Sequence, residues 1–171
     1  MEKIYTHFYN EYFSLKKEMK HVDGFYFMEH APIFGSKTDE VQHHVSPYDF
    51  LHGWCDIFAF ALYETFGYPI YCIKEKKQDK IAIHYYCKPQ HPDGCVADVR
   101  GITNDDFLFL QEFEEWLENS SYTYKVNPQT IYNRIKNDYD KSIYKTALAI
   151  IHNNMNGYNS EKITERSESH V

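Results

Sequence analysis

The segment of residues 55–66 constrains the fold more than any other part of the chain, because it is apolar on most of its sides. A helix with no polar face is stable only when it is buried in a protein core. Gly67 follows it directly, and glycine is the residue best suited to close a helix. Pro69 then prevents the helix from continuing. The sequence therefore predicts a central buried helix that ends at Phe66.

Three short segments after this helix are typical of strands. Residues 70–73 form an apolar run, and residues 81–87 and 95–99 flank a loop rich in turn-forming residues. Two apolar runs joined in this way favour an antiparallel hairpin. We therefore expect a small antiparallel sheet beside the central helix.

The remaining segments show helical patterns. Residues 2–20 and 104–117 each predict a helix, and residues 47–52 follow a helix-start signal. From residue 127 to Ile151, apolar residues recur at four-residue intervals, which predicts one long helix. The predicted fold class is therefore α+β: a central helix packed on a small antiparallel sheet, with additional N- and C-terminal helices.

The length of 171 residues and the apolar content of 43% are sufficient for one globular domain with a hydrophobic core. We assign residues 1–156 to a single domain of catalytic type. Residues 23–45 lack periodicity and predict a long loop, which suits a functional cover. Residues 157–171 are polar and predict a disordered tail.

The net charge of −7 and the absence of a basic stripe argue against nucleic acid as a partner. No apolar run approaches the roughly 18 residues of a membrane span, so no membrane partner is expected. The N-terminal residues lack the pattern of a signal peptide. The sequence therefore predicts a cytoplasmic protein whose four cysteines are reduced. Secretion by a route that needs no signal peptide stays open.

Cys55 stands where a nucleophilic thiol is expected. It lies at the first turn of the buried helix, where unpaired backbone N–H groups and the helix dipole favour a thiolate. The same N–H groups can bind the oxyanion of an acyl intermediate. The alternative is an ordinary buried cysteine, a residue type that is among the most buried.

His84 and Asp98 complete a candidate triad. A cysteine nucleophile needs a nearby base, and the base needs a group that orients its other nitrogen. A hairpin folded symmetrically about His91 sets His84 opposite Asp98, with their Cβ atoms roughly 5 Å apart. A slip of one residue would place the two side chains on opposite faces of the sheet.

The order of these residues resembles the transglutaminase-like branch of the papain-like cysteine enzymes. The resemblance covers roughly residues 50–101 and is carried by Gly-Trp-Cys-Asp at 53–56, Ile-His-Tyr at 83–85 and Ala-Asp-Val-Arg-Gly at 97–101. In that family a helix presents the cysteine, the next strand the histidine, and the adjoining strand the acid.

The resemblance implies that Cys55 is the nucleophile, His84 the base and Asp98 the orienting group. It implies an acyl-transfer enzyme (a hydrolase, deamidase or transamidase) that acts on an amide, ester or thioester. The acyl substrate would be a small molecule or a protein, and no cofactor is implied.

The sequence departs from the papain pattern at the oxyanion site. Asp49 stands where papain-type enzymes have a glutamine, so Gln42 and the indole of Trp54 are the candidates for the missing donor. Arg100 either binds a substrate carboxylate or pairs with Asp56, and the ion pair is favoured. No Cys-x-x-Cys or His-Glu-x-x-His spacing occurs, so no metal site is predicted.

A second class of function fits the same features. The short length and the acidity are compatible with a non-catalytic interaction or inhibitor protein on the same fold. The last residues, 169–171, match a pattern for domains that capture a C-terminal carboxylate.

Overall fold

The structure, a computed structural model, describes residues 47–76, 81–92, 94–104, 106–110, 113, 117 and 121–160 of the chain. Several predictions from the sequence lie outside these residues: the helix at 2–20, the loop at 23–45, the oxyanion candidate Gln42 and the C-terminal pattern at 169–171.

The predicted central helix is confirmed as α3 (Cys55–Phe66), which has six consecutive buried residues from Ile57 to Leu62. It ends at Gly67, whose left-handed φ of 74° closes the helix with a bond from its N–H to the carbonyl oxygen of Tyr63 at 2.7 Å. A residue with a Cβ would be strained in this conformation. The apolar pattern thus identified the burial of this helix, and Gly67 identified its end.

The sheet is antiparallel and has five strands in the described part of the chain, so the protein is of the α+β class. The strand order is β4-β3-β2-β1-β5. The strands are β1 (Ile70–Glu75), β2 (Ala82–Cys87), β3 (Val96–Asp98), β4 (Gly101–Thr103) and β5 (Ser121–Lys125). The first three confirm the strands expected from the sequence, whereas β4 and β5 were not predicted.

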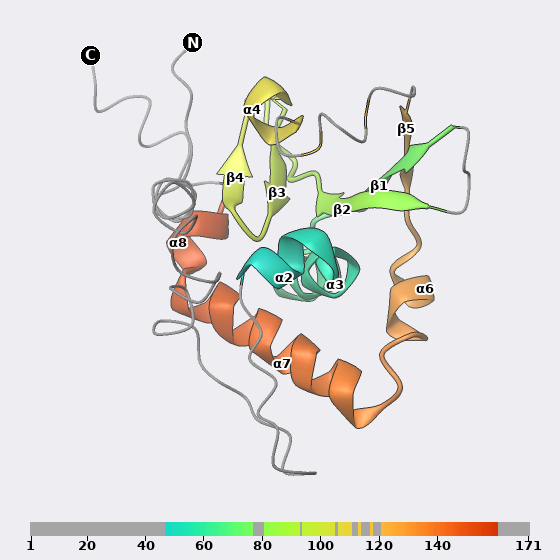
Figure 1. The fold of residues 1–171 in the computed structure, drawn as a ribbon. Helices are drawn as coiled ribbons and strands as arrows, with labels where there is room; N and C mark the ends of the chain where they lie inside the picture. Colours follow the sequence, from blue (N-terminus) through green and yellow to red (C-terminus); the bar gives the residue numbers. More distant parts are fainter. Residues whose placement is uncertain are drawn as a thin grey trace, which may run out of the picture.

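Strand alternation gives this sheet two faces with different partners. On the α3 face, Cys87 donates a hydrogen bond from its Sγ to the carbonyl oxygen of Ala59 in α3. On the opposite face, here called the α4 face, Tyr86 and Val96 pack against Phe109 of α4 (Asp106–Leu110). In Figure 1, α3 lies below β1 and β2, and α4 lies above β3 and β4.

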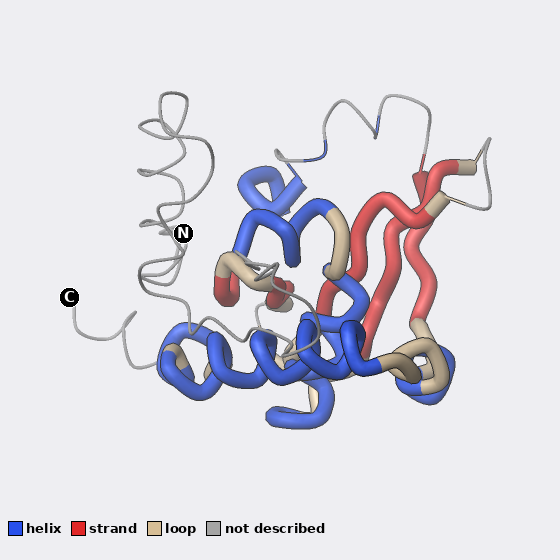
Figure 2. Tube along the Cα trace, turned by 60° about the horizontal axis from the view of Figure 1, so that its bottom comes forward, coloured by secondary structure: helices blue, strands red, loops and turns tan. Residues whose placement is uncertain are grey.

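Within the described ranges, four further helices frame this core. They are α2 (Pro47–His52), α6 (Pro128–Tyr132), α7 (Asp138–Asn153) and α8 (Met155–Tyr158). The short helix predicted at residues 47–52 is thereby confirmed. Figure 2 shows α7 as the longest helical stretch along one side of the molecule, next to α6 and α8.

The prediction of one long helix from residue 127 is wrong, because α6 and α7 are separate helices. Asn127 begins α6 by accepting a hydrogen bond from the backbone N–H of Gln129 at 3.0 Å. Asn137 begins α7 in the same way, accepting from the N–H of Asp140 at 2.7 Å. Asparagine at an N-cap satisfies an otherwise unpaired N–H group, so the second Asn starts a new helix.

The packed structure continues beyond residue 156. Tyr158 is fully buried and donates a hydrogen bond from its hydroxyl to the carbonyl oxygen of Val99 at 2.8 Å. The hydroxyl of Tyr68 donates to the carbonyl oxygen of Tyr158 at 3.0 Å. The predicted start of the disordered tail at residue 157 is therefore too early, because one buried tyrosine ties this segment to the core.

Among the described residues, no helix combines the length and the apolar character that crossing a membrane requires. The helix predicted at residues 104–117 is described in part, as α4. Phe113 and Leu117, farther along the same segment, contribute to the core.

Candidate active site

His84 and Asp98 form a buried pair, as the sequence predicts. The Nε2 atom of His84 lies 3.0 Å from Oδ2 of Asp98, and both side chains are buried. The His84 side chain comes from β2, and the Asp98 side chain comes from the end of β3. A histidine on a strand has little freedom, so its ring is held in one orientation.

The register that produces this pair differs from the prediction. Cys87 pairs with Ala97, so the two strands are shifted by two residues and His84 is not directly opposite Asp98. The turn of residues 91–94, closed by Gly94 at a φ of 65°, centres the hairpin one residue later than assumed. A shift of two residues keeps both side chains on the same face, so the contact becomes diagonal and survives.

Arg100 holds Asp98 from the other side. Its Nη2 atom lies 2.6 Å from Oδ2, and its Nε and backbone N atoms donate to Oδ1 at 3.0 and 2.9 Å. The same Nη2 donates to the carbonyl oxygen of Phe109. The favoured pairing of Arg100 with Asp56 is wrong, because β3 ends at Asp98 and turns Arg100 back onto it. Arg100 is only 1% exposed in this structure, and its binding of a substrate carboxylate stays a prediction.

Aromatic rings from the segment after β4 enclose the pair. The ring centroid of Phe113 lies 4.4 Å from that of His84, and the ring of Phe109 lies 6.0 Å away. Both rings also lie beneath the guanidinium of Arg100, at 5.2 Å for Phe109 and 5.4 Å for Phe113. Sequence reasoning did not assign these phenylalanines to the site. The spacing of four residues between Phe109 and Phe113 was the sequence signal that could have identified them, because residues four apart lie on the same side of a helix.

Asp98 and His84 differ in their charge at neutral pH. Burial by itself would raise the pKa of Asp98, but the Arg100 guanidinium and the hydrogen bonds from His84 and Arg100 hold that pKa well below its usual range. Burial lowers the pKa of His84, against the opposing effect of Asp98. At neutral pH the cluster therefore holds an ionised Asp98 beside a neutral imidazole.

The hydrogen bonds assign the tautomer of that imidazole. An ionised carboxylate only accepts hydrogen bonds, so Nε2 of His84 carries the proton that Asp98 accepts. The other nitrogen, Nδ1, then has a free lone pair. It is buried and has no hydrogen-bond partner among the described residues. A neutral histidine with one bound and one bare nitrogen has the form of a general base.

Cys55 reaches the strand beside His84. Its Sγ atom accepts a hydrogen bond from the backbone N–H of Tyr85 at 3.4 Å. That N–H is available because the described ladder between β2 and β3 consists of the pair Cys87–Ala97. The sulfur therefore lies at the place where the two strands separate. No hydrogen bond joins it to the His84 ring in the described structure.

The protonation state of Cys55 departs from the expectation. Burial raises the pKa of the Cys55 thiol to about 12, and the N–H of Tyr85 offsets this only in part. The prediction from the sequence is a thiolate at the helix start, but the partly buried thiol loses solvent, and this loss raises its pKa. In this conformation Cys55 is a neutral thiol.

Further residues surround the thiol on the α3 face. Asp56 forms an ion pair with Arg134 at 2.9 Å, and the Arg134 guanidinium lies 5.7 Å from the Tyr85 ring centroid. Neither Arg134 nor Tyr85 was assigned to the site from the sequence. Trp54 immediately precedes α3 and packs against the core. Its role as an oxyanion donor stays a prediction.

The described residues contain no group of three or more His, Cys, Asp or Glu side chains placed to hold a metal ion. Cys55, Cys72, Cys87 and Cys95 are all free thiols. The chemistry that the described site offers is therefore that of a thiol, an imidazole and a carboxylate.

Comparisons of the chain with protein-family models, with curated proteins and with solved structures found no match. The case for a function therefore depends on the residues of the site.

Proposed function

We propose that this protein is a cysteine-dependent acyl-transfer enzyme of the transglutaminase-like or papain-like type, with Cys55, His84 and Asp98 as its triad. The observation that carries the proposal is the buried His84, whose Nε2 is bound to ionised Asp98 while Nδ1 is bare. The Sγ atom of Cys55 accepts a hydrogen bond from the backbone N–H of Tyr85, the residue that follows His84. The substrate is an amide, ester or thioester of a small molecule or a protein.

The reaction starts from a neutral thiol and a neutral imidazole. As Sγ of Cys55 attacks the acyl carbon, the thiol proton passes to Nδ1 of His84. The bond from the acyl carbon to the leaving group then breaks, and His84 returns the proton to that group. Water or an amine next attacks the thioester, gives a proton to Nδ1 and releases the thiol.

Asp98 and Arg100 act on the charge that forms in this step. When Nδ1 accepts a proton, His84 becomes an imidazolium, and the ionised Asp98 stabilises it at 3.0 Å. Arg100 acts as a positioning residue, because its hydrogen bonds fix both oxygens of Asp98. Cys55 contacts β2 from the α3 face, whereas the His84 ring lies on the α4 face, so the proposed transfer requires Sγ to reach Nδ1 through the gap where β2 and β3 separate when substrate binds.

An acylation assay with p-nitrophenyl acetate tests the proposal. We expect a burst of p-nitrophenolate equal to the protein concentration, and an acetyl group on the peptide that contains Cys55 by mass spectrometry. Cys55→Ala abolishes the burst. His84→Gln lowers its rate about 100-fold or more, which is the usual contribution of a general base.

Cys72→Ala is the matched control, because Cys72 is a free thiol near the site, opposite Tyr85 in the β1–β2 ladder, but is completely buried and has no role in the proposed triad. This variant keeps the burst. Acetylation spread evenly over the four cysteines, or an unchanged rate in His84→Gln, contradicts the proposal.

One observation favours a second candidate, a non-catalytic interaction protein on the same fold. Burial raises the pKa of Cys55 to about 12, which suits a structural cysteine better than a nucleophile. In that case Cys55→Ala leaves every activity unchanged and Cys55 stays unlabelled by the ester. The acylation assay therefore separates the two candidates.

A further inference from the structure

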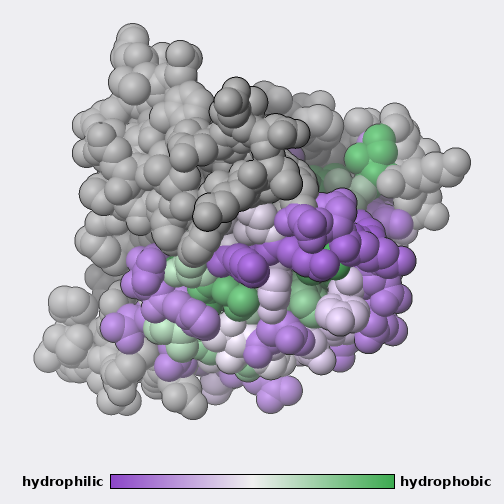
Figure 3. All heavy atoms as spheres, turned by 90° about the horizontal axis from the view of Figure 1, so that it is seen from below, coloured by the Kyte–Doolittle hydropathy of each residue, from purple (hydrophilic) through white to green (hydrophobic). Residues whose placement is uncertain are grey.

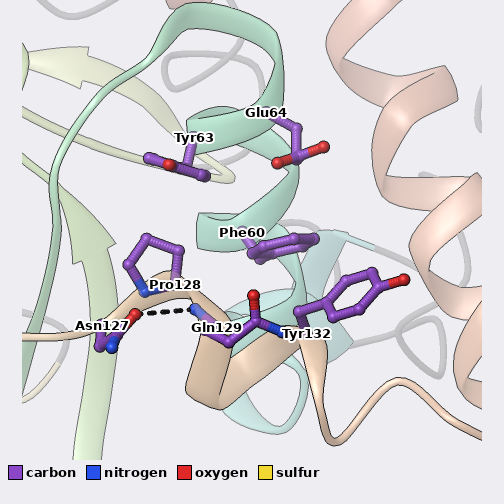
Figure 4. A pocket seen from close by; sticks show the side chains of 7 residues that line it. All are labelled: Phe60, Tyr63, Glu64, Asn127, Pro128, Gln129 and Tyr132. Atoms are coloured by element: carbon purple, nitrogen blue, oxygen red, sulfur yellow. Dashed lines mark hydrogen bonds between the residues drawn. The ribbon is translucent and has the colours of Figure 1, made fainter.

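An open pocket of about 330 Å³ lies between α3 and α6, apart from the triad. Three aromatic rings line it, and Figure 4 shows them around one hollow. Phe60 is buried and forms the floor, with its ring centroid 6.1 Å from that of Tyr63 and 6.1 Å from that of Tyr132. Tyr132 is 59% exposed and forms the rim. The faces of such rings carry partial negative charge.

Beside the tyrosine hydroxyls and the Asn127 amide, the pocket contains two hydrogen-bond acceptors, the Glu64 carboxylate and the side-chain oxygen of Gln129. Glu64 has no ion-pair partner among the described residues, and Figure 4 shows its carboxylate beside Phe60. The side-chain nitrogen of Gln129 is bound to Asn133 at 2.9 Å, and its oxygen is directed toward Phe60. The side-chain oxygen of Asn127 is already used by the N–H of Gln129. The pocket therefore combines electron-rich rings with a carboxylate and an amide oxygen.

We propose that this pocket binds the ammonium group of a lysine side chain on a polypeptide partner. A cation gains from the ring faces and from the Glu64 carboxylate together. The aliphatic stem of lysine packs along an aromatic wall while its charged end meets the acceptors. The volume is at the lower end of ligand sites, which suits one side chain better than a larger cofactor.

The placement of the acceptors favours ammonium over guanidinium. Glu64 and Gln129 stand on either side of the Phe60 floor, so they approach a ligand from different directions. The diverging N–H bonds of an ammonium suit that arrangement, whereas the planar fork of guanidinium prefers one bidentate carboxylate. The net charge of −7 also attracts a basic partner to the surface.

An NMR titration of the full ¹⁵N-labelled chain with the peptide acetyl-Gly-Lys-Gly-amide tests this inference. We expect saturable shifts of the backbone signals of Phe60, Glu64 and Gln129, with weak affinity. The same peptide with an acetylated lysine side chain is the neutral control and binds at least about fivefold more weakly. Glu64→Gln weakens the lysine peptide about threefold, and Tyr132→Ala weakens it about two- to fivefold.

Glu75→Gln is the matched control variant. Glu75 pairs with Ser121 at the end of the β1–β5 ladder far from residue 127, so its charge is remote from the pocket. It leaves the affinity unchanged. An equal loss in Glu75→Gln overturns the inference, because it would show attraction by net charge alone.

Two other outcomes also overturn the inference. Equal binding of the acetylated peptide would show that the pocket does not recognise charge. Binding of free spermidine with no binding of the lysine peptide would assign the pocket to a polyamine. These readouts measure binding only, so they are independent of the acylation assay.

Discussion

The two faces of the sheet are stabilised in different ways. Most of the α3 face is formed by apolar side chains, and Ala59, Ala61 and Leu62 of α3 are almost completely buried. The α4 face holds a histidine, a carboxylate and a guanidinium within its aromatic rings. Apolar burial is non-directional and tolerates small shifts. A buried charge network is stabilising only while all its members are in place, so the α4 face is the more vulnerable one.

Removal of Arg100 has the largest expected effect. Arg100→Leu leaves the Asp98 carboxylate buried without its cation, and we expect the free energy of unfolding to fall by about 3–5 kcal/mol. Urea denaturation followed by circular dichroism measures it.

The same substitution at an exposed arginine supplies the control. Arg134 pairs with Asp56 but is 51% exposed, so Arg134→Leu costs less than about 1 kcal/mol. Equal losses at the two positions would contradict the distinction between the faces.

The sequence predicted the elements whose signal is local. The apolar residues from Cys55 to Phe66 and the cap at Gly67 define α3 without tertiary information. The three-residue strand β3 was identified as the hairpin partner of β2, whereas β4 and β5, with three and five residues, had no such turn signal and were missed. Asn137 was overlooked as a helix start because the apolar spacing continued across it.

For the site, the residue types were predictable but the geometry was not. His84 and Asp98 were paired by assuming a hairpin centre, and the true register differs by two residues. The pair survived only because side chains alternate with a period of two. The partner of Arg100 depends on the turn after β3, and the pKa of Cys55 depends on burial by the whole fold. Neither is encoded in a local pattern.

The two faces are also expected to differ in how much they contribute to the pH dependence of stability. The pKa values of His84 and Asp98 are both lowered in the folded state, so the unfolded chain binds more protons than the folded chain as the pH falls. The contribution of His84 is complete above its unfolded pKa of about 6.5 and is lost as the pH falls below it. That of Asp98 is complete above about 4 and is lost at lower pH. We expect stability to fall in two stages on acidification.

Two variants assign these stages, with urea midpoints measured from pH 3 to pH 8. His84→Gln removes the loss that begins below about pH 6.5 and keeps the loss below about pH 4. Leu62→Ala, on the α3 face, lowers stability by about 3 kcal/mol at every pH and leaves both stages in place. An unchanged first stage in His84→Gln would mean that another group causes it.

The smallest effect on stability is expected at Asp56. This residue has the same side chain as Asp98, but its pKa is shifted in the opposite direction. Burial raises the pKa of Asp56, and the exposed Arg134 only partly offsets this. Its charge therefore opposes folding: stability is highest below the unfolded pKa of Asp56, falls as the pH rises through the folded pKa, and is lowest above it.

Asp56→Asn removes that charge and keeps an oxygen that can accept from the N–H of Ile57, as Oδ1 does at 2.9 Å. We expect the free energy of unfolding at pH 7 to change by less than about 0.5 kcal/mol or to increase slightly, because the lost surface ion pair and the relieved burial of charge nearly cancel. Asp98→Asn, the same change on the α4 face, lowers stability by several times as much. A loss at Asp56 as large as that at Asp98 would show that the carboxylates are equivalent and that Arg100 gives Asp98 no special role.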